Sequence, residues 1–496
     1  MSEISPQPSS ITAARGPDPR RWWILAVIGV AQLMVVLDAT IVNIALPSAQ
    51  HDLGFSDADR QWVVTAYSLA FGSLLLIGGR LADLIGHKIV FLTGVTGFAV
   101  ASALAGAADS FGLLVGGRAL QGAFGALLAP AALSLLNITF TEAKERAKAL
   151  GVYGAIAGTG GAIGLLLGGL LTEHLNWRWT LYVNLVFAVL ALLGGSMLLR
   201  RTQREHRTRV DVPGTLLISV GLFCLVYGLS NAESHGWGSA RTWGYLSVGI
   251  LLIACFTYWQ TRAAYPLLPL RILRDRDRAA SFIAVLIAAS GMFGIFLFLT
   301  YYLQLSLGYS PVQTGLAFLP MIAALIVSAQ IATNVTVSRF GPRIAVPAGM
   351  AVAAAGMIWL TSIGLDTGYT SHVLPPLLVL GLGLGHVMPP ALGAATARVA
   401  PSDAGAASAA VTTMQQIGGS IGTALLNTLA ASAATSYLAG HTANKQALAE
   451  AQLHSFTTAF WWSAGIFAAG MLCTGLLYRP RLRGAATEQP AVAPGL

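Results

Sequence analysis

Two charged side chains lie in segments that are otherwise apolar enough for lipid. Asp38 belongs to LDATIVNIALP (37–47), which closes an apolar run that begins at Trp22, and Arg118 opens the stretch RALQGAFGALLAPA (118–131). A carboxylate at the centre of a membrane span costs about 2.5–3.5 kcal/mol on insertion scales, so it needs either a partner or a use. A buried carboxylate can bind and release a proton as its surroundings change, and these residues suggest that chemistry.

The depths of the two charges predict that they meet. At about 1.5 Å per residue, Asp38 lies roughly 24 Å from the cytoplasmic edge of a hydrocarbon core about 30 Å thick, and Arg118 lies roughly 13 Å below its outer surface. A nearby guanidinium favours the ionised carboxylate and desolvation favours the protonated one, so a balanced pair could load and release a proton. Two alternatives are a carboxylate that snorkels or is capped near a helix end, and a static ion pair between helices.

The elements that must position these charges are membrane-spanning helices. The chain has 496 residues, of which 55% are hydrophobic and 10% charged, and its mean hydropathy is +0.68. Soluble proteins carry about 25% charged residues, so the composition predicts an all-α polytopic membrane protein. Fourteen apolar segments are expected to span the bilayer: 22–46, 60–79, 89–107, 110–136, 149–172, 179–200, 212–230, 244–262, 279–302, 312–336, 343–363, 373–395, 404–432 and 456–478.

The positions of the basic residues predict the topology. If the N-terminus is cytoplasmic, most of the 29 lysine and arginine residues fall on the cytoplasmic side of the predicted spans, as the positive-inside rule requires. We therefore expect both termini in the cytoplasm. The net charge of +9 has the same origin, because the basic clusters at 200–209 and 271–278 suit topology signals beside anionic lipid better than nucleic-acid binding.

A short internal repeat suggests two similar halves. GRLADLIGHK (79–88) follows the second predicted span and SRFGPR (338–343) follows the tenth, so that Gly341 echoes Gly86. Repeats of six helices about an axis along the membrane normal are a transporter architecture. The expected parts are a cytoplasmic tail, an N-terminal six-helix bundle, a linker with two extra spans, a C-terminal six-helix bundle and a second cytoplasmic tail, at 1–21, 22–200, 201–278, 279–478 and 479–496.

The loop between the second and third predicted spans could form an ionic latch. Asp83 lies close in sequence to Arg80 and Lys88, and such charges can stabilise one conformational state, although they also suit ordinary topology signals. Gly79 and Gly86 would allow the tight backbone that a short loop needs. We expect these five residues to act as a gate on the cytoplasmic side.

A run of glycines marks the fifth predicted span, GVYGAIAGTGGAIGLLLGGLL (151–171). Small residues at helical spacing allow helices to approach closely. The pattern indicates either packing alone or a sliding interface between the two halves, and the second also requires close packing. The glycines concerned are Gly154, Gly158, Gly161, Gly164 and Gly168.

Isolated polar residues inside apolar segments are candidates for a substrate cavity. Gln32 and Asn43 share one face of the first predicted span and Asp38 lies about 120° away, so this span contacts protein or a wet cavity on more than one side. His386 stands out because histidine titrates near neutral pH. Each such residue more often makes a helix–helix hydrogen bond than a ligand contact. The set is Gln32, Asn43, Tyr67, Gln121, Tyr153, Gln304, His386, Gln415 and Gln416.

Motifs of nucleotide-driven and metal-dependent enzymes are absent from the sequence. It contains no GxxxxGK[ST] nucleotide loop and no HExxH metal-binding helix, and each predicted loop is too short for a soluble catalytic domain. We therefore expect neither an enzyme, nor ATP drive, nor a metal or other cofactor.

These motifs together resemble those of the major facilitator superfamily, and in particular its fourteen-span drug:proton antiporters. The resemblance covers roughly 20–478. It rests on LDATIVNIALP in the first predicted span, GGRLADLIGHK in the following loop, RALQGAFGALLAPA in the fourth span, the glycine run in the fifth and GAASAAVTTMQQIGGSIGTAL (405–425) in the thirteenth. It implies a major facilitator fold of two six-helix bundles plus two inserted helices, with fourteen transmembrane helices in all.

The resemblance also implies residue roles and a function. Asp38 and Arg118 would take part in proton coupling and Asp83 in the loop gate, whereas Gly164-Leu165 departs from the Gly-Pro that is usual in the antiporter motif. The implied protein is a bacterial cytoplasmic-membrane exporter in which proton entry drives efflux of hydrophobic or cationic small molecules, such as drugs and antibiotics. Its expected partners are protons, the substrate and the lipid bilayer, and a monomer is expected. Alternatives are a dedicated exporter of a self-made metabolite, amino acid or siderophore, and a non-transporting membrane sensor.

Overall fold

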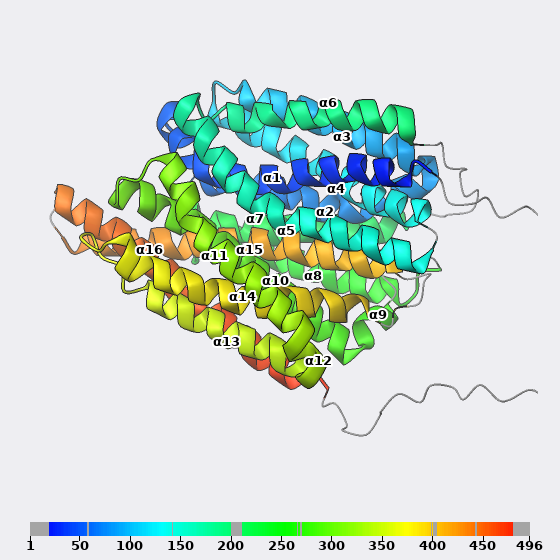
Figure 1. The fold of residues 1–496 in the computed structure, drawn as a ribbon. Helices are drawn as coiled ribbons and strands as arrows, with labels where there is room; N and C mark the ends of the chain where they lie inside the picture. The colour runs from blue at the N-terminus through cyan, green and yellow to red at the C-terminus, as the bar shows by residue number, and fades with distance from the viewer. Residues whose placement is uncertain are drawn as a thin grey trace, which may run out of the picture.

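The computed structural model describes residues 19–479 apart from 57–58, 141, 200–210, 265, 268–269, 398, 400–403 and 442–443. Every regular element within these residues is a helix, and the long helices run side by side in one bundle (Figure 1). Helices satisfy all their backbone hydrogen bonds internally, which is why long apolar segments adopt this structure in lipid. The predicted all-α membrane fold is confirmed.

Six helices form the N-terminal half. They are α1 (Arg21–Leu53), α2 (Gln61–Ile85), α3 (His87–Gly106), α4 (Phe111–Thr139), α5 (Ala143–His174) and α6 (Trp179–Leu198). Helix α1 packs on α5 and α6, α4 packs on α2 and α3, and α3 packs on α6. Helix α1 therefore lies between α5 and α6 with its remaining face near α4.

The C-terminal half repeats this arrangement. Its helices are α10 (Arg276–Tyr301), α11 (Pro311–Ile331), α12 (Val337–Phe340), α13 (Pro342–Leu360), α14 (Leu374–Thr396), α15 (Ala404–Ala439) and α16 (Lys445–Leu477), with π-helical turns η1 (Tyr302–Ser306), η2 (Ala332–Thr336) and η3 (Tyr369–Val373). Helix α10 packs on α15 and α16, α14 packs on α11 and α13, and α13 packs on α16. Each of these pairs has its counterpart in the N-terminal half.

The echoed glycines occupy equivalent positions in the two halves. Gly86 separates α2 from α3 with φ +102°, and Gly341 separates α12 from α13 with φ +76°. Side chains are strained at such φ values, so both loops require glycine to turn the chain directly into the next helix. The short sequence echo therefore marks a structural repeat.

Two further long helices are inserted between the halves. Helices α7 (Val212–His235) and α8 (Ala240–Gln260) form a hairpin that packs on α2 and α15, and the short α9 (Leu270–Arg274) follows it. The Ser219 hydroxyl donates to the Ser73 carbonyl of α2 at 2.6 Å, and the Thr428 hydroxyl of α15 donates to the Leu229 carbonyl at 3.3 Å. The hairpin thus contacts both halves along one side of the molecule.

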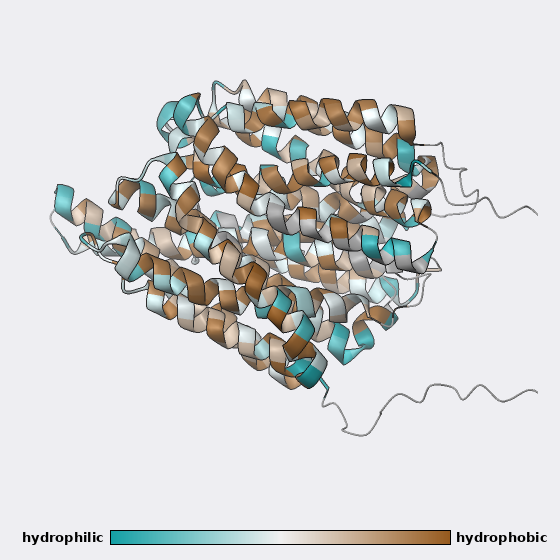
Figure 2. Cartoon of the chain, viewed as in Figure 1, coloured by the Kyte–Doolittle hydropathy of each residue, from teal (hydrophilic) through white to brown (hydrophobic). Residues whose placement is uncertain are grey.

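Twelve helices of the described part of the chain are long and apolar enough to cross a membrane. Helices α2 and α5, with 25 and 32 residues, are also long enough, so the fourteen spans expected from the sequence stay a prediction. Figure 2 shows hydrophobic residues along the bodies of the helices and hydrophilic residues concentrated toward their ends. This distribution is typical of a polytopic membrane protein.

The two ends of the described chain lie on the same side of the bundle (Figure 1). We call the side where α1 begins and α16 ends the tail side, and the opposite side the distal side. The helices of the two halves run at an angle and diverge toward the tail side in this view. Most of the predicted tails, and the basic cluster at 200–209, lie outside the described residues.

Candidate functional site

Asp38 of α1 and Arg118 of α4 form an ion pair in the core of the N-terminal half. The Arg118 Nη1 atom donates to the Asp38 Oδ2 atom at 2.6 Å, and the two residues are 0% and 1% exposed. The contact expected from their depths is present, and a snorkelling carboxylate is excluded because Asp38 does not reach the surface. Removal of one partner of such a buried pair is strongly destabilising, so the pair helps to hold α1 against α4.

Two amide side chains complete the surroundings of the carboxylate. Gln121 Nε2 donates to Asp38 Oδ1 at 2.9 Å, and Asn184 Nδ2 of α6 donates to the same oxygen at 2.7 Å. Gln121 Nε2 also donates to the Ser102 hydroxyl of α3 at 2.7 Å. Because both carboxylate oxygens accept hydrogen bonds, the site can hold an ionised carboxylate away from water.

Arg118 has further partners besides the carboxylate. Its Nε atom donates to the Val63 carbonyl of α2 at 3.1 Å, its Nη1 atom donates to Gln121 Oε1 at 2.9 Å, and its guanidinium carbon lies 4.5 Å from the centre of the Tyr67 ring. The cation is therefore held by a carbonyl, an amide and an aromatic face as well as by Asp38. None of these three contacts involves Asp38 itself.

The sequence of α4 explains how these groups come together. Arg118 and Gln121 are three residues apart and so lie on the same face of the helix. Gly117 and Gly122 flank this face, and a Cβ atom there would lie 2.7 Å from Ala105 Cβ and 2.2 Å from the Tyr67 carbonyl oxygen. The two glycines thus allow α4 to approach α3 and α2 closely enough for the buried contacts to form.

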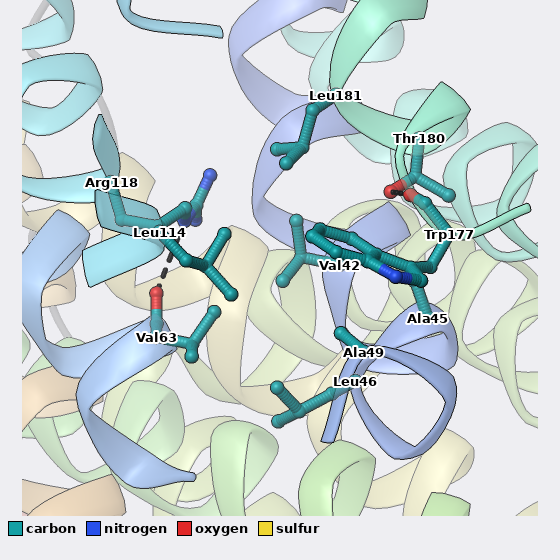
Figure 3. Close-up of a pocket in the computed structure, with 10 residues that line it drawn as sticks. All are labelled: Val42, Ala45, Leu46, Ala49, Val63, Leu114, Arg118, Trp177, Thr180 and Leu181. Atoms are coloured by element: carbon teal, nitrogen blue, oxygen red, sulfur yellow. Dashed lines mark hydrogen bonds between the residues drawn. The ribbon is translucent and has the colours of Figure 1, made fainter. Parts of the chain in front are cut away.

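A small cavity adjoins Arg118 between α1, α2, α4 and α6 (Figure 3). Its volume of about 10 Å³ is close to the minimum for one water molecule. Apart from the arginine its lining is mostly apolar: Val42, Ala45, Leu46, Ala49, Val63, Leu114, Trp177, Thr180 and Leu181. Arg118 therefore faces a small, mostly apolar space, in which its electrostatic interactions are strong.

Two helices of the site contribute residues that the sequence analysis did not select. Asn184 is 0% exposed on α6, and Ser102 is 0% exposed on α3. Both are polar residues in otherwise apolar predicted spans, which is the criterion that selected Gln121. The criterion could therefore have included Asn184, but the sequence contains no sign that it faces Asp38.

The predicted loop gate is only partly described. Lys88 Nζ donates to the carbonyls of Ser196 and Leu199 at 2.8 and 2.5 Å, and Arg80 Nη2 donates to the Pro266 carbonyl at 3.3 Å. Lys88 thus binds the C-terminal end of α6, where the helix dipole favours a cation. The side chain of Asp83 lies outside the described residues, so the predicted ionic latch stays a prediction.

The described glycines of the fifth span pack inside the N-terminal half. A Cβ atom at Gly164 would lie 2.0 Å from the Thr40 hydroxyl, and one at Gly168 would lie 3.0 Å from Ile41, both on α1. Gly161 is also nearest to Thr40, whereas the contacts of Gly154 and Gly158 lie outside the described part of the structure. Gly161, Gly164 and Gly168 therefore face α1 of the same half and not the other half, where a sliding interface between the halves would place them.

Helix α5 crosses α11 of the other half at residues next to these glycines in the sequence. A Cβ atom at Gly169 would lie 2.6 Å from the Pro311 carbonyl oxygen, and one at Gly315 of α11 would lie 2.5 Å from the Leu165 carbonyl oxygen. Leu165 stands where the antiporter motif that the sequence resembles usually has proline, and α5 is continuous from Ala143 to His174. Close contact between backbones occurs at this crossing without that proline.

Hydrogen bonds join the two halves on the distal side. The Tyr301 hydroxyl donates to Gln50 Oε1 at 2.6 Å, and Arg60 Nε donates to Asn427 Oδ1 at 3.2 Å. The Arg60 guanidinium also lies 4.3 Å from the centre of the Tyr301 ring. Glu173, just beyond the predicted end of the fifth span, accepts a hydrogen bond from the N-terminus of α11. These contacts close the distal side in the conformation described.

The pKa of Glu173 lies below its usual range. Its carboxylate is stabilised by hydrogen bonds from the side chain of Ser310 and from the Val312 backbone N–H, the latter at 3.0 Å. The positive end of the α11 dipole lies at the same position. Glu173 is therefore ionised at neutral pH and does not titrate there.

The predicted cavity residues do not form one site. Tyr67 and Gln121 belong to the surroundings of the ion pair, and the Tyr153 hydroxyl donates to Gln32 Oε1 at 2.6 Å between α5 and α1. Asn43 Nδ2 donates to a carbonyl of its own helix. Most of these residues therefore make hydrogen bonds within the protein, which was the alternative considered for each of them.

The remaining cavity candidates lie in the C-terminal half. Gln304 Nε2 donates across the halves to the Ile44 carbonyl at 3.1 Å. The imidazole of His386 forms hydrogen bonds with the hydroxyls of Ser328 at 2.7 Å and Thr336 at 3.3 Å, so it links α14 to α11 and η2. Gln415 and Gln416 are half-buried on α15, and Gln416 packs against Gly72 of α2.

Comparison with known proteins identifies the family. The family model described as the Major Facilitator Superfamily matches residues 28–423. The chain belongs to the major facilitator superfamily. This assignment agrees with the paired six-helix halves and makes the protein a multi-pass membrane protein of a transporter family rather than an enzyme family.

Several known resistance and export proteins are similar to the chain. A puromycin resistance protein of Streptomyces alboniger is 48% identical over 97% of this chain and 96% of that protein. A tetracenomycin C resistance and export protein of Streptomyces glaucescens is 38% identical over 87% and 80% of the two chains. A cephamycin export protein of Amycolatopsis lactamdurans is 38% identical over 81% and 83%.

Solved structures of other transporters share the fold. A bacterial homologue of the human lysosomal transporter Spinster, solved in an inward-facing unoccupied conformation, has a TM-score of 0.66 at 16% identity and covers 93% of this chain and 98% of its own. The POT family transporter PepTSo has a TM-score of 0.67 at 15% identity, and the match covers 93% of this chain and 99% of that chain. At these identities the likeness concerns the fold alone.

Proposed function

We propose that this superfamily member is a proton-coupled antiporter that exports hydrophobic or cationic small molecules by alternating access, with Asp38 as the proton carrier. The observation that supports this most directly is the buried pair of Asp38 and Arg118. Its carboxylate is surrounded by donors, and its guanidinium has other acceptors in Val63 and Gln121. Proton binding at Asp38 therefore weakens one contact of the arginine without leaving the cation unsolvated.

The positive-inside pattern supports a cytoplasmic location of the tail side and of both termini. We propose that fourteen helices span a bacterial cytoplasmic membrane in this orientation. The distal hydrogen bonds between the halves then lie on the outer side, and the conformation described is closed to the outside. In the proposed cycle, Asp38 binds a proton when the outer side is open. Loss of its charge loosens the tie to Arg118 and favours closure of that side.

The second half of the cycle returns the proton to the cytoplasm. Substrate enters from the cytoplasm or the inner leaflet between the halves, Asp38 releases its proton inward, and the recharged pair favours reopening to the outside. The loop that contains Arg80, Asp83 and Lys88 would gate the inner side. One proton that crosses about 100 mV releases roughly 2.3 kcal/mol, which sustains a gradient on the order of 40-fold for an uncharged substrate exchanged one for one.

A dedicated exporter of one antibiotic-like metabolite is the second candidate. The names of the similar proteins favour it, because tetracenomycin C, cephamycin and puromycin each define one of them. A broad drug exporter and a dedicated exporter would share the proton chemistry at Asp38. They differ in how many compounds drive proton movement.

Purified protein in liposomes that contain a pH-sensitive dye tests the proposal. A panel of cationic and hydrophobic compounds, puromycin included, is added one at a time, and proton movement is recorded together with compound uptake. Proton movement with many compounds supports broad export, and with a single compound supports dedicated export. Compound transport without any proton movement, or no transport of any compound, contradicts the proton-coupled antiporter.

A further inference from the structure

Asn184 is bonded through only one end of its amide. Its Nδ2 atom donates to Asp38 Oδ1 at 2.7 Å. Its Oδ1 atom is buried and receives no hydrogen bond from any residue that the structure describes. A buried amide oxygen without a donor loses its interaction with water and gains nothing in return. The position therefore holds an unused acceptor beside the proposed proton carrier.

Gln121 contacts the same carboxylate oxygen but is held at both ends. Its Oε1 atom accepts from Arg118 Nη1 at 2.9 Å, while its Nε2 atom donates to Asp38 Oδ1 at 2.9 Å and to the Ser102 hydroxyl at 2.7 Å. Rotation of this amide would break all three bonds and point an N–H group at the arginine. Of the two amides beside Asp38, Asn184 is thus the one whose oxygen is available.

We propose that Asn184 reverses its hydrogen bond with Asp38 each time the carboxylate gains or loses its proton. The proposal rests on the proposed function, because it requires Asp38 to carry the proton. With Asp38 ionised, Asn184 donates through Nδ2 to the carboxylate. When a proton from the outer solution binds to Asp38 Oδ1, half a turn of the amide brings Asn184 Oδ1 to the same place, where it accepts from the new O–H group.

Ser102 can follow the same reversal. Its hydroxyl oxygen lies 3.4 Å from Asn184 Nδ2 and accepts from Gln121. A hydroxyl group is also a donor, so its own proton can turn toward Asn184 Oδ1 after the amide has turned. The carboxyl O–H is the only covalent bond that forms or breaks, and release of the proton to the cytoplasm restores the first set of hydrogen bonds.

This assignment makes Asn184 a positioning residue for both charge states of Asp38. Leucine at this position is similar in size but offers neither a donor to the carboxylate nor an acceptor to the protonated acid. The variant therefore affects the step that binds and releases the proton. Exchange of substrate for substrate across the membrane does not require that step, because the carrier returns loaded in both directions.

The test compares proton-driven uptake with substrate counterflow in liposomes for the wild type and Asn184→Leu over a range of pH. We expect proton-driven uptake to fall at least about tenfold, the factor that corresponds to one charge-assisted hydrogen bond, with a displaced pH profile and counterflow retained. Asn184→Ser keeps a group that both donates and accepts and should retain the wild-type pH profile. If Asn184→Leu does not fold, the pH profiles of Asn184→Ala and Asn184→Ser are compared instead, because alanine also lacks a donor and an acceptor.

Asn231→Leu is the matched control. Asn231 is another buried asparagine, on α7, where it donates to the Thr242 hydroxyl of α8 at 3.2 Å. Its replacement should leave the ratio of proton-driven uptake to counterflow unchanged. An unchanged pH profile in Asn184→Leu, or an equal loss of uptake and counterflow, overturns the inference. A wild type that transports without moving protons overturns the proposed function instead.

Discussion

Replacement of Asp38 and Arg118 singly and together would separate the structural role of the ion pair from its role in coupling. Asp38→Asn keeps the shape of the side chain and leaves Arg118 as a buried cation. Removal of one partner of a buried pair typically costs about 3–5 kcal/mol. The lower end applies here, because Arg118 retains its bonds to Val63 and Gln121 and its contact with Tyr67.

The double variant Asp38→Asn/Arg118→Gln removes both charges. It should be more stable than Asp38→Asn alone, and we expect a coupling energy of about 2–3 kcal/mol from the double-mutant cycle. Unfolding in detergent, followed by intrinsic tryptophan fluorescence as denaturant is added, measures these differences. The same variants in liposomes should all lose proton-driven uptake, and the double variant should retain substrate counterflow.

The ion pair of Asp52 and Arg178 provides the control cycle. It lies in the same half, but its side chains are 48% and 29% exposed, and exposed pairs typically contribute about 0–1 kcal/mol. Asp52→Asn and Arg178→Gln should therefore leave stability and coupling nearly unchanged. A coupling energy near zero for Asp38 and Arg118 would refute the packing argument, and full proton-driven uptake by the double variant would refute the coupling argument.

Three predictions concern the distal contacts between the halves. Each is measured as the accessibility of a single cysteine, introduced on the distal side, to a water-soluble thiol reagent. The protein used for these measurements lacks its three native cysteines. Gly169→Leu should raise accessibility strongly, because even a Cβ added at this position would lie 2.6 Å from the Pro311 carbonyl oxygen at the start of α11. Unchanged accessibility would contradict the close crossing. Arg60→Ala should raise it by a smaller factor, since it removes a hydrogen bond and a ring contact worth about 1–3 kcal/mol together; Arg60→Lys tests whether the planar guanidinium is needed. The pKa of Glu173 is lowered by hydrogen bonds from Ser310 and Val312, so its contribution is complete above the usual glutamate range and is lost only as the pH falls through the lowered pKa. Accessibility should thus be constant around neutral pH and rise only in acid, and Glu173→Gln should abolish that rise.

The sequence predicted most of the fold because lipid makes its signals strong. Unpaired backbone groups are excluded from the bilayer core, so each long apolar segment must be a helix, and composition alone locates it. The predicted span at 404–432, for example, corresponds to the single continuous helix α15 (Ala404–Ala439). The echo of Gly86 in Gly341 was short, yet it marked the repeat because a positive φ admits few other residues.

From the sequence, only the charged residues of the candidate site and their depth in the membrane could be predicted. Asp38 and Arg118 could be paired because a buried charge needs an opposite charge at the same level. The neutral residues carry no such requirement. Asn184 and Ser102 could have bonded to several neighbours, and the glycines on α5 could have faced either α1 or α11.

What the sequence by itself determined, then, is the set of helices, their order and the two charges that must meet. Only the tertiary structure decided which helix faces meet: Gln121 and Asn184 on one carboxylate oxygen, Gly164 and Gly168 against α1, and Gly169 against α11. The physical reason is that a helix in lipid satisfies its backbone by itself, so hydrophobicity fixes that it spans but not how it is rotated. Rotation follows from close packing between helices, and packing depends on residues far apart in the chain.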